Sequence, residues 1–262
     1  MTLLEIAGIG LTVVVACMTA LWLISLAIRN VSIVDIFWGL GFVVLAFTCF
    51  VLSDGVEGRK LLVLALVTIW GLRLSAHIAF RNRGHGEDYR YQSMRTRWGA
   101  RFWWISYFQT FLLQGGLLWV ISAPLLVAMD SADPDNLTPV DAIGMFVWCV
   151  GIFFEAVGDW QLARFKADRA NQGKVMRTGL WRYTRHPNYF GDATVWWGLF
   201  IIAAGTAWGV AAAFAPIIMT ALLLRVSGVA LLERTITKRR PEYADYIQTT
   251  SPFIPWPPKK RT

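Results

Sequence analysis

The amino-acid sequence predicts an all-α membrane protein, a polytopic bundle of about seven helices in one integral membrane domain of residues 1–262. Hydrophobic residues make up 56% of the chain and charged residues only 16%, whereas soluble domains average about 25% charged residues. The apolar residues also form long uninterrupted stretches. A helix of about 20 such residues crosses the hydrocarbon core of a bilayer, because each residue advances the helix by about 1.5 Å.

Seven stretches have the composition of membrane spans. The first is too long for the apolar core of a signal peptide and lacks its basic start. The sixth is short for a full crossing and relies on a break near Gly205. In chain order the expected spans are Leu3–Ile28, Ile33–Leu52, Leu61–Phe80, Phe102–Met129, Val140–Asp159, Ala193–Trp208 and Val210–Leu232.

Basic residues gather in the third-to-fourth and fifth-to-sixth connections and in the tail. With seven crossings these segments lie on one side, and the positive-inside rule makes that side cytoplasmic. The N-terminus then faces outward and the C-terminus is cytoplasmic. The net charge of +8 is explained in this way, so no nucleic-acid partner is expected. Three cysteines lie inside apolar stretches without metal-ligand spacing, so no metal site is expected.

Ionisable residues inside apolar spans are candidates for function, since an unpaired charge there is costly. Asp35 lies near the start of the second span, and Arg73 and His77 lie late in the third. One interpretation is a structural ion pair between Asp35 and Arg73. The other is a buried carboxylic acid that donates a proton or a hydrogen bond to a substrate oxygen.

The segment Arg185-His186-Pro187-Asn188-Tyr189 precedes the sixth span. Pro187 suits the first turn of a new helix. Arg185 and His186 would then lie at a helix N-terminus, where backbone N–H groups favour anions. A phosphate-bearing cofactor that enters from the cytoplasm fits this arrangement, while a cytoplasmic anchor would explain only the arginines.

This five-residue motif resembles one shared by steroid 5α-reductases, sterol reductases, and isoprenylcysteine or phospholipid methyltransferases. The first two groups bind NADPH there, and the last binds S-adenosylmethionine. The amino-terminal half is similar to the bacterial branch of the steroid 5α-reductase family, and the resemblance covers about residues 34–255. The elements that carry it are Asp35–Gly39, Trp70–Arg73, Arg81–Gly84 and Glu87–Tyr91.

The resemblance implies a role for each matching residue. Asp35 and Trp70 correspond to the glutamate and tyrosine that bind the substrate ketone, so residues 1–101 would carry substrate and acid, and residues 102–262 the cofactor. Asn188 and Asp192 would hold the nicotinamide end of NADPH, Asp159 would be a further cofactor-binding residue, and Tyr183 and His186 would line the same pocket. The arginines expected to bind its phosphates are Arg83, Arg164, Arg177 and Arg185.

The expected activity is NADPH-dependent reduction of the C=C bond of an enone in a hydrophobic substrate, with a 3-oxo-Δ4-steroid as the leading candidate. The substrate would enter from the bilayer, and the expected location is a bacterial inner membrane with the cofactor on the cytoplasmic side. No Gly-x-Gly-x-x-Gly follows a strand, so a Rossmann site is not expected. No obligate protein partner is evident. The alternatives are an S-adenosylmethionine-dependent lipid methyltransferase and a lipid-binding transporter or scaffold without activity.

Overall fold

A computed structural model describes residues 1–226, 229, 233, 236 and 240–259 of the chain. In this part the secondary structure is helical, and one isolated parallel bridge pairs Thr184 with Ser251. Five helical stretches are long and apolar enough to cross a membrane: Leu3–Ile28, Ile33–Leu52, Glu57–Asn82, Tyr89–Asp130 and Pro139–Ala167. The protein is therefore a multi-pass helical membrane protein, as the sequence predicts.

The chain forms two compact units. The first contains residues 1–138 and 203–212, and the second contains residues 139–202 and 213–262. The division of roles expected at residues 101 and 102 stays a prediction.

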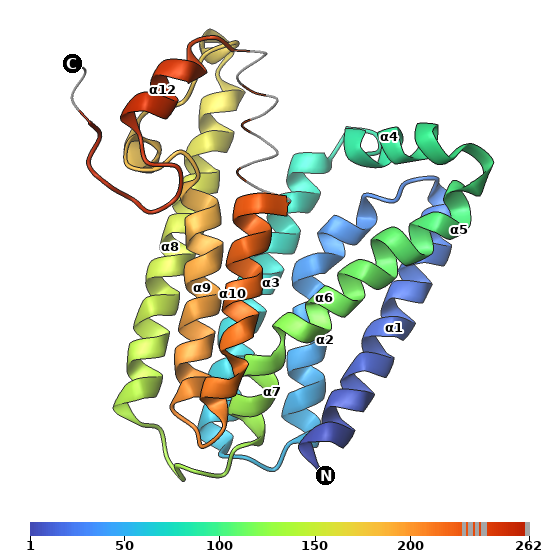
Figure 1. The fold of residues 1–262 in the computed structure, drawn as a ribbon, viewed down its shortest axis with the longest axis vertical. Helices are drawn as coiled ribbons and strands as arrows, with labels where there is room; N and C mark the ends of the chain where they lie inside the picture. The colour runs from blue at the N-terminus through green and yellow to red at the C-terminus, as the bar shows by residue number, and fades with distance from the viewer. Residues whose placement is uncertain (227–228, 230–232, 234–235, 237–239, 260–262) are drawn as a thin grey trace. The chain divides into compact units, whose positions relative to one another are not determined.

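The first unit begins with three long helices (Figure 1), of which α1 and α2 have the predicted bounds and α3 contains the predicted third span. The predicted fourth span corresponds to a helical stretch with a π-helical turn in its first half and a break near Ser122. The short helix before it, α4, was not predicted. The helices are α1 (Leu3–Ile28), α2 (Ile33–Leu52), α3 (Glu57–Asn82), α4 (Tyr89–Trp98), α5 (Phe102–Ser106), η2 (Tyr107–Leu112), α6 (Leu113–Ile121) and α7 (Ala123–Asp130).

Helices α2 and α3 pack with their backbones almost in contact. A Cβ atom on Gly39 would lie 2.4 Å from the carbonyl oxygen of Gly71, and one on Gly71 would lie 2.6 Å from that of Gly39. The hydroxyl of Ser75 also accepts a hydrogen bond from the backbone N–H of Leu40 at 3.1 Å. This close approach fixes the helix that carries Asp35 against its neighbour.

The second unit is built on two long helices, α8 (Pro139–Ala167) and α9 (Pro187–Ala204). Helix α9 begins at Pro187, as the sequence predicts, and ends directly before the predicted break at Gly205. The predicted seventh span begins with η5 (Gly209–Ala213), most of which belongs to the first unit, and continues with α10 (Phe214–Ala221) and η6 (Leu222–Val226) of the second. Most of its remainder lies outside the described residues. The short elements η3 (Arg169–Asn171), η4 (Gly179–Arg182) and α12 (Tyr243–Thr249) complete this unit.

Glycines spaced seven residues apart bring α8 and α9 side by side (Figure 1). A Cβ atom on Gly144 would lie 2.7 Å from the carbonyl oxygen of Gly198, and one on Gly151 would lie 2.5 Å from the backbone nitrogen of Val195. One on Gly158 would lie 3.2 Å from the backbone nitrogen of Asn188. The glycine face of α8 therefore positions the start of α9.

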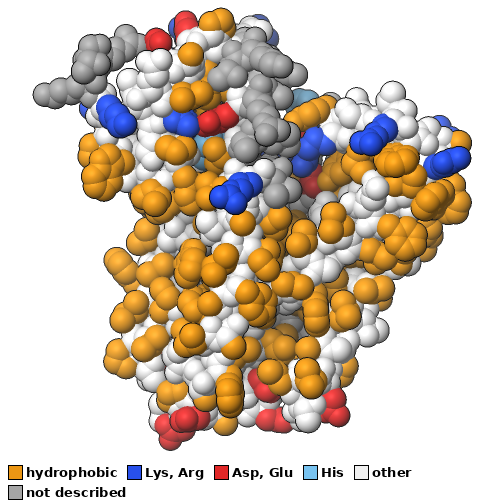
Figure 2. Space-filling view, in the orientation of Figure 1, with side chains coloured by type: hydrophobic (Ala, Val, Ile, Leu, Met, Phe, Trp, Pro, Cys, Tyr) orange, Lys and Arg blue, Asp and Glu red, His pale blue; other side chains and the backbone are white. Residues whose placement is uncertain are grey.

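The outer surfaces of the helices are apolar, as a bilayer requires. In the most apolar window of α1 only 17% of the residues are buried inside the protein. Figure 2 shows hydrophobic side chains over most of the visible surface, with charged side chains gathered near helix ends. These surfaces are suited to lipid contact.

Candidate functional site

Asp35, in the first turn of α2, binds two side chains of α4. Its Oδ2 accepts a hydrogen bond from Nη2 of Arg90 at 2.6 Å, and its Oδ1 accepts one from the hydroxyl of Tyr91 at 2.6 Å. Nε2 of Gln114 donates a further bond of 3.2 Å to the Tyr91 oxygen. The ionic partner of Asp35 is thus Arg90 rather than Arg73, and the short distances are typical of hydrogen bonds to a charged group.

Hydrogen bonds from backbone N–H groups to side chains hold the segment before α4 at the start of α2. The backbone N–H of Val31 donates to Oε1 of Glu87 at 2.9 Å, and the backbone N–H of Asp88 donates to the hydroxyl of Ser32 at 2.7 Å. Arg95 then binds both oxygens of Glu87, at 3.0 and 2.9 Å. The segment before α4 therefore positions Arg90 and Tyr91 over Asp35.

Sequence reasoning did not assign a role to Tyr91. Tyr91 belongs to the Glu87–Tyr91 element, which resembles the steroid 5α-reductase family, but no function was predicted for its side chain. The contact between Asp35 and Tyr91 could not be predicted, because 56 residues separate them and no local sequence pattern connects them.

Trp70 is fully buried in α3, and its ring meets that of Phe42 edge to face at 5.6 Å between centroids. Phe42 lies seven residues beyond Asp35 on α2. Since each residue advances a helix by about 1.5 Å, this contact lies about 10 Å along α2 from Asp35. The expected role of Trp70 at the substrate ketone stays a prediction.

In the second unit, the start of α9 brings Asn188 to Asp159 of α8. Nδ2 of Asn188 donates to Oδ1 of Asp159 at 3.0 Å, while its Oδ1 accepts from the backbone N–H of Tyr189 at 3.1 Å. Asp159 and Asp192 are both buried. The structure thus brings together Asn188 and Asp159, two residues that the resemblance assigns to cofactor binding.

Arg185 and His186 bind the protein itself. Nε and Nη2 of Arg185 donate to the two oxygens of Glu233 at 2.7 and 3.1 Å, and Nη1 donates to the carbonyl groups of Ile247 and Thr250. Nε2 of His186 lies 3.1 Å from Oε1 of Glu233. Arg185 therefore uses four of its five N–H donors on protein groups, which gives it a structural role, and the expected phosphate contact stays a prediction.

Burial acts to raise the pKa of Glu233, but hydrogen bonds from His186 and Arg185 outweigh it and lower the pKa to about 2. Glu233 is therefore a carboxylate at neutral pH. It was not among the predicted site residues, since it lies 48 residues after Arg185.

The C-terminal segment is bound along the residues before α9. The backbone N–H of Arg185 donates to the carbonyl of Ser251 at 2.9 Å, and the hydroxyl of Thr184 donates to that of Phe253 at 2.7 Å. The backbone N–H of Trp256 donates to the carbonyl of Tyr183 at 2.9 Å, while the Tyr183 side chain is exposed. The C-terminal segment and the residues before α9 thus form one structural element.

The other predicted phosphate contacts are spread over the surface. Arg83 is exposed at the end of α3, and exposed Arg164 lies over the ring of Trp160 at 5.6 Å. Arg177 donates to the carbonyl of Glu242 and lies over the ring of Tyr246 at 5.6 Å. Arg83 and Arg164 are therefore accessible cations, while Arg177 is partly engaged by the protein.

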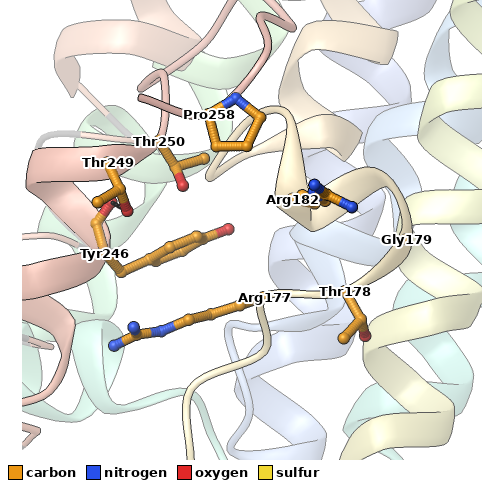
Figure 3. A pocket seen from close by; sticks show the side chains of 8 residues that line it. All are labelled: Arg177, Thr178, Gly179, Arg182, Tyr246, Thr249, Thr250 and Pro258. Carbon is orange, nitrogen blue, oxygen red and sulfur yellow. Dashed lines mark hydrogen bonds between the residues drawn. The ribbon is translucent and has the colours of Figure 1, made fainter. Parts of the chain in front are cut away.

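A cavity of about 430 Å³ lies in the second unit (Figure 3). Its size falls within the range of about 300–1,000 Å³ typical of small-molecule sites. It is lined by Arg177, Thr178, Gly179, Arg182, Tyr246, Thr249, Thr250 and Pro258.

Fold and site together define a multi-pass helical membrane protein with a half-buried acidic residue, Asp35, in one unit and an amide–carboxylate pair, Asn188 and buried Asp159, in the other. Residues 21–250 match the family described as "Protein of unknown function (DUF1295)". The chain belongs to this family.

An uncharacterized protein of Schizosaccharomyces pombe is 26% identical over 211 residues, which are 70% of this chain and 60% of that protein. The chain thus spans less than two thirds of this relative's length. No solved structure matches the chain.

Proposed function

We propose that the protein is an NADPH-dependent membrane reductase that acts on the C=C bond of an enone in a hydrophobic substrate, with 3-oxo-Δ4-steroids as the first candidates. The observation that carries the proposal is the Asp35–Tyr91 hydrogen bond of 2.6 Å on a membrane helix. A carboxylate and a phenol paired in this way can supply a hydrogen bond to a ketone oxygen as negative charge develops there.

Each residue of this cluster has a task in the proposed reaction. Arg90 and Tyr91 each bind one oxygen of Asp35, and Gln114 donates a hydrogen bond to the Tyr91 oxygen. When a ketone oxygen competes with Asp35 for the Tyr91 proton, the hydroxyl stabilises the enolate that forms. In this version Tyr91 is the donor and Asp35 positions it, whereas the sequence alone favoured Asp35 as the donor.

The residues at the start of α9 fit the nicotinamide end of a dinucleotide. The Asn188 amide is held by Asp159 and by the Tyr189 backbone, so it is preorganised for a carboxamide that needs both a donor and an acceptor. The accessible guanidinium groups of Arg83 and Arg164 are suited to phosphates. When bound, NADPH supplies the hydride that reduces the β-carbon of the enone.

The proposal is tested with two matched tyrosine variants of the detergent-purified protein. Tyr91→Phe is expected to lower kcat for NADPH oxidation with a 3-oxo-Δ4-steroid about 100-fold, because one preorganised donor is lost. Its Kd for NADPH is expected to stay unchanged. Tyr89→Phe is the control, since exposed Tyr89 lies on the same helix, and it should keep full activity. Equal turnover by both variants would remove Tyr91 from the mechanism.

We also propose seven crossings with the N-terminus outside and the C-terminus in the cytoplasm of a bacterium, where NADPH is found. The loop charges support this topology. The test introduces Thr2→Cys or Lys259→Cys into a variant without the native cysteines and labels whole cells with an impermeant maleimide. Labelling of position 2 alone is expected. Labelling of both positions in intact cells would mean an even number of crossings.

A further inference from the structure

The cavity in the second unit has the chemistry of an anion site. Two guanidinium side chains and the hydroxyl-bearing Thr178, Thr249 and Thr250 line it, and no Asp or Glu is among its described lining residues. Charge-assisted hydrogen bonds from such groups favour a phosphate ester.

The two arginines differ in their availability. Arg177 donates to the Glu242 carbonyl and lies over Tyr246, so the protein holds it in place. Arg182 is exposed and makes no ion pair with any residue that the structure describes. Figure 3 shows Arg182 across the cavity from Tyr246. Arg182 is therefore the cation that can receive an added anion.

One wall of the cavity lies beside an aromatic residue of α8. Oε1 of Gln161 accepts a hydrogen bond from the backbone N–H of Leu180 at 3.0 Å, next to lining residue Gly179. The preceding residue on α8, Trp160, is 58% exposed. Because exposed Trp residues of membrane proteins concentrate at the lipid headgroup level, this wall is expected to lie at that level.

A second exposed aromatic residue lies close in sequence to lining residue Pro258. Pro258 lines the cavity, and Trp256, two residues earlier, is 68% exposed, as is much of Ile254. The hydrogen bond from Trp256 to Tyr183 fixes this stretch to the segment before α9. Two exposed tryptophans, which are suited to the membrane interface, thus lie within two residues of Gln161 and Pro258 in the chain.

We infer that this cavity binds the phosphate of an anionic membrane phospholipid, with Arg182 as its main cationic ligand and Trp160 and Trp256 beside the acyl chains. A soluble dinucleotide also carries phosphates, but the exposed tryptophans favour a ligand that lies in the membrane. The inference goes beyond the proposed reductase activity and does not depend on it, because lipid binding is measured without turnover.

The test is a native mass-spectrometry titration of the detergent-purified full chain with dioleoyl phosphatidylglycerol, and with the phosphatidylcholine analogue for comparison. Arg182→Gln is expected to weaken phosphatidylglycerol binding about tenfold, because the charge-assisted hydrogen bonds of the guanidinium group are lost. The matched control is Arg169→Gln, an exposed arginine of the same connection that does not line the cavity. It should change the affinity less than twofold.

Equal weakening by both variants would mean attraction by surface charge alone and would overturn the inference. A parallel titration with NADPH and with inorganic pyrophosphate separates the sources of phosphate. If Arg182→Gln weakens NADPH tenfold and leaves phosphatidylglycerol unchanged, the cavity belongs to the dinucleotide and the inference is wrong. Thr178→Val removes only one hydroxyl and should weaken phosphatidylglycerol several-fold, which gives a second readout if Arg182→Gln does not fold.

Discussion

Glu233 balances the charges of the motif that precedes α9. Its two oxygens bind the buried guanidinium of Arg185, and one of them also lies beside His186. Removal of one partner from a buried ion pair leaves the other charge uncompensated, at a cost of about 3–5 kcal/mol. The carboxylate thus stabilises the segment that orients Asn188.

We therefore expect Glu233→Gln to lower the stability of the protein by about 3 kcal/mol. Thermal unfolding in detergent measures the change. Glu242→Gln is the matched control, because Glu242 is exposed and binds Arg177 through its backbone carbonyl. Similar melting temperatures for wild type and both variants would contradict a stabilising role for Glu233.

The lowered pKa of Glu233 also predicts an acid-sensitive contribution to stability. A carboxylate whose pKa falls from 4.5 to about 2 on folding contributes fully above pH 4.5, and this contribution is lost as the pH falls toward 2. Melting temperatures between pH 7 and pH 3 measure it. The wild type should lose more stability over this range than Glu233→Gln does. Parallel pH profiles would show that Glu233 is not the titrating group.

At the scale of the elements, the glycine face of α8 determines where α9 begins. Gly151→Ala would place a methyl group 2.5 Å from the backbone nitrogen of Val195. Because backbone cannot move aside cheaply, we expect a loss of stability of about 1–3 kcal/mol. Thermal unfolding tests this expectation, with Gly116→Ala as the control.

A Cβ atom on Gly116, in α6, meets nothing within 4 Å. Gly116→Ala should therefore be neutral or slightly stabilising, because alanine has the higher helix propensity. Equal behaviour of the two alanine variants would mean that the α8–α9 contact tolerates a methyl group.

The long apolar helices could be predicted because twenty or more apolar residues leave no alternative to a membrane span. Helices α1 and α2 accordingly have the predicted bounds. Helix α4 was missed because it has only ten residues, mostly polar, and is stabilised by distant contacts such as that of Asp88 with Ser32. Sequence alone did not place it.

The candidate site was predictable only where its residues are neighbours in sequence. The Arg185–Tyr189 motif and the helix start at Pro187 could be identified locally. The partners that decide the roles could not, since Arg90 lies 55 residues from Asp35 and Glu233 lies 48 residues from Arg185. Both pairs are contacts that no local sequence pattern indicates.

At the scale of the whole molecule, the proposed function divides the tasks between the two units. The first carries Asp35 and Tyr91, and the second carries Asn188, Asp159 and the segment fixed by Glu233. The Arg185–Tyr189 motif of the second unit resembles one found in reductases and in methyltransferases alike. Which cofactor the protein binds, NADPH or S-adenosylmethionine, therefore decides between a reductase and a methyltransferase.

The most direct test is a binding titration of the purified protein with NADPH and, separately, with S-adenosylmethionine, followed by thermal unfolding. A ligand that binds only the folded state raises the melting temperature in proportion to its affinity and concentration. The account predicts stabilisation by NADPH, its reduction in Asn188→Ala, and no effect of S-adenosylmethionine. Stabilisation by S-adenosylmethionine alone would contradict the reductase and leave Asp35 as a structural partner of Arg90.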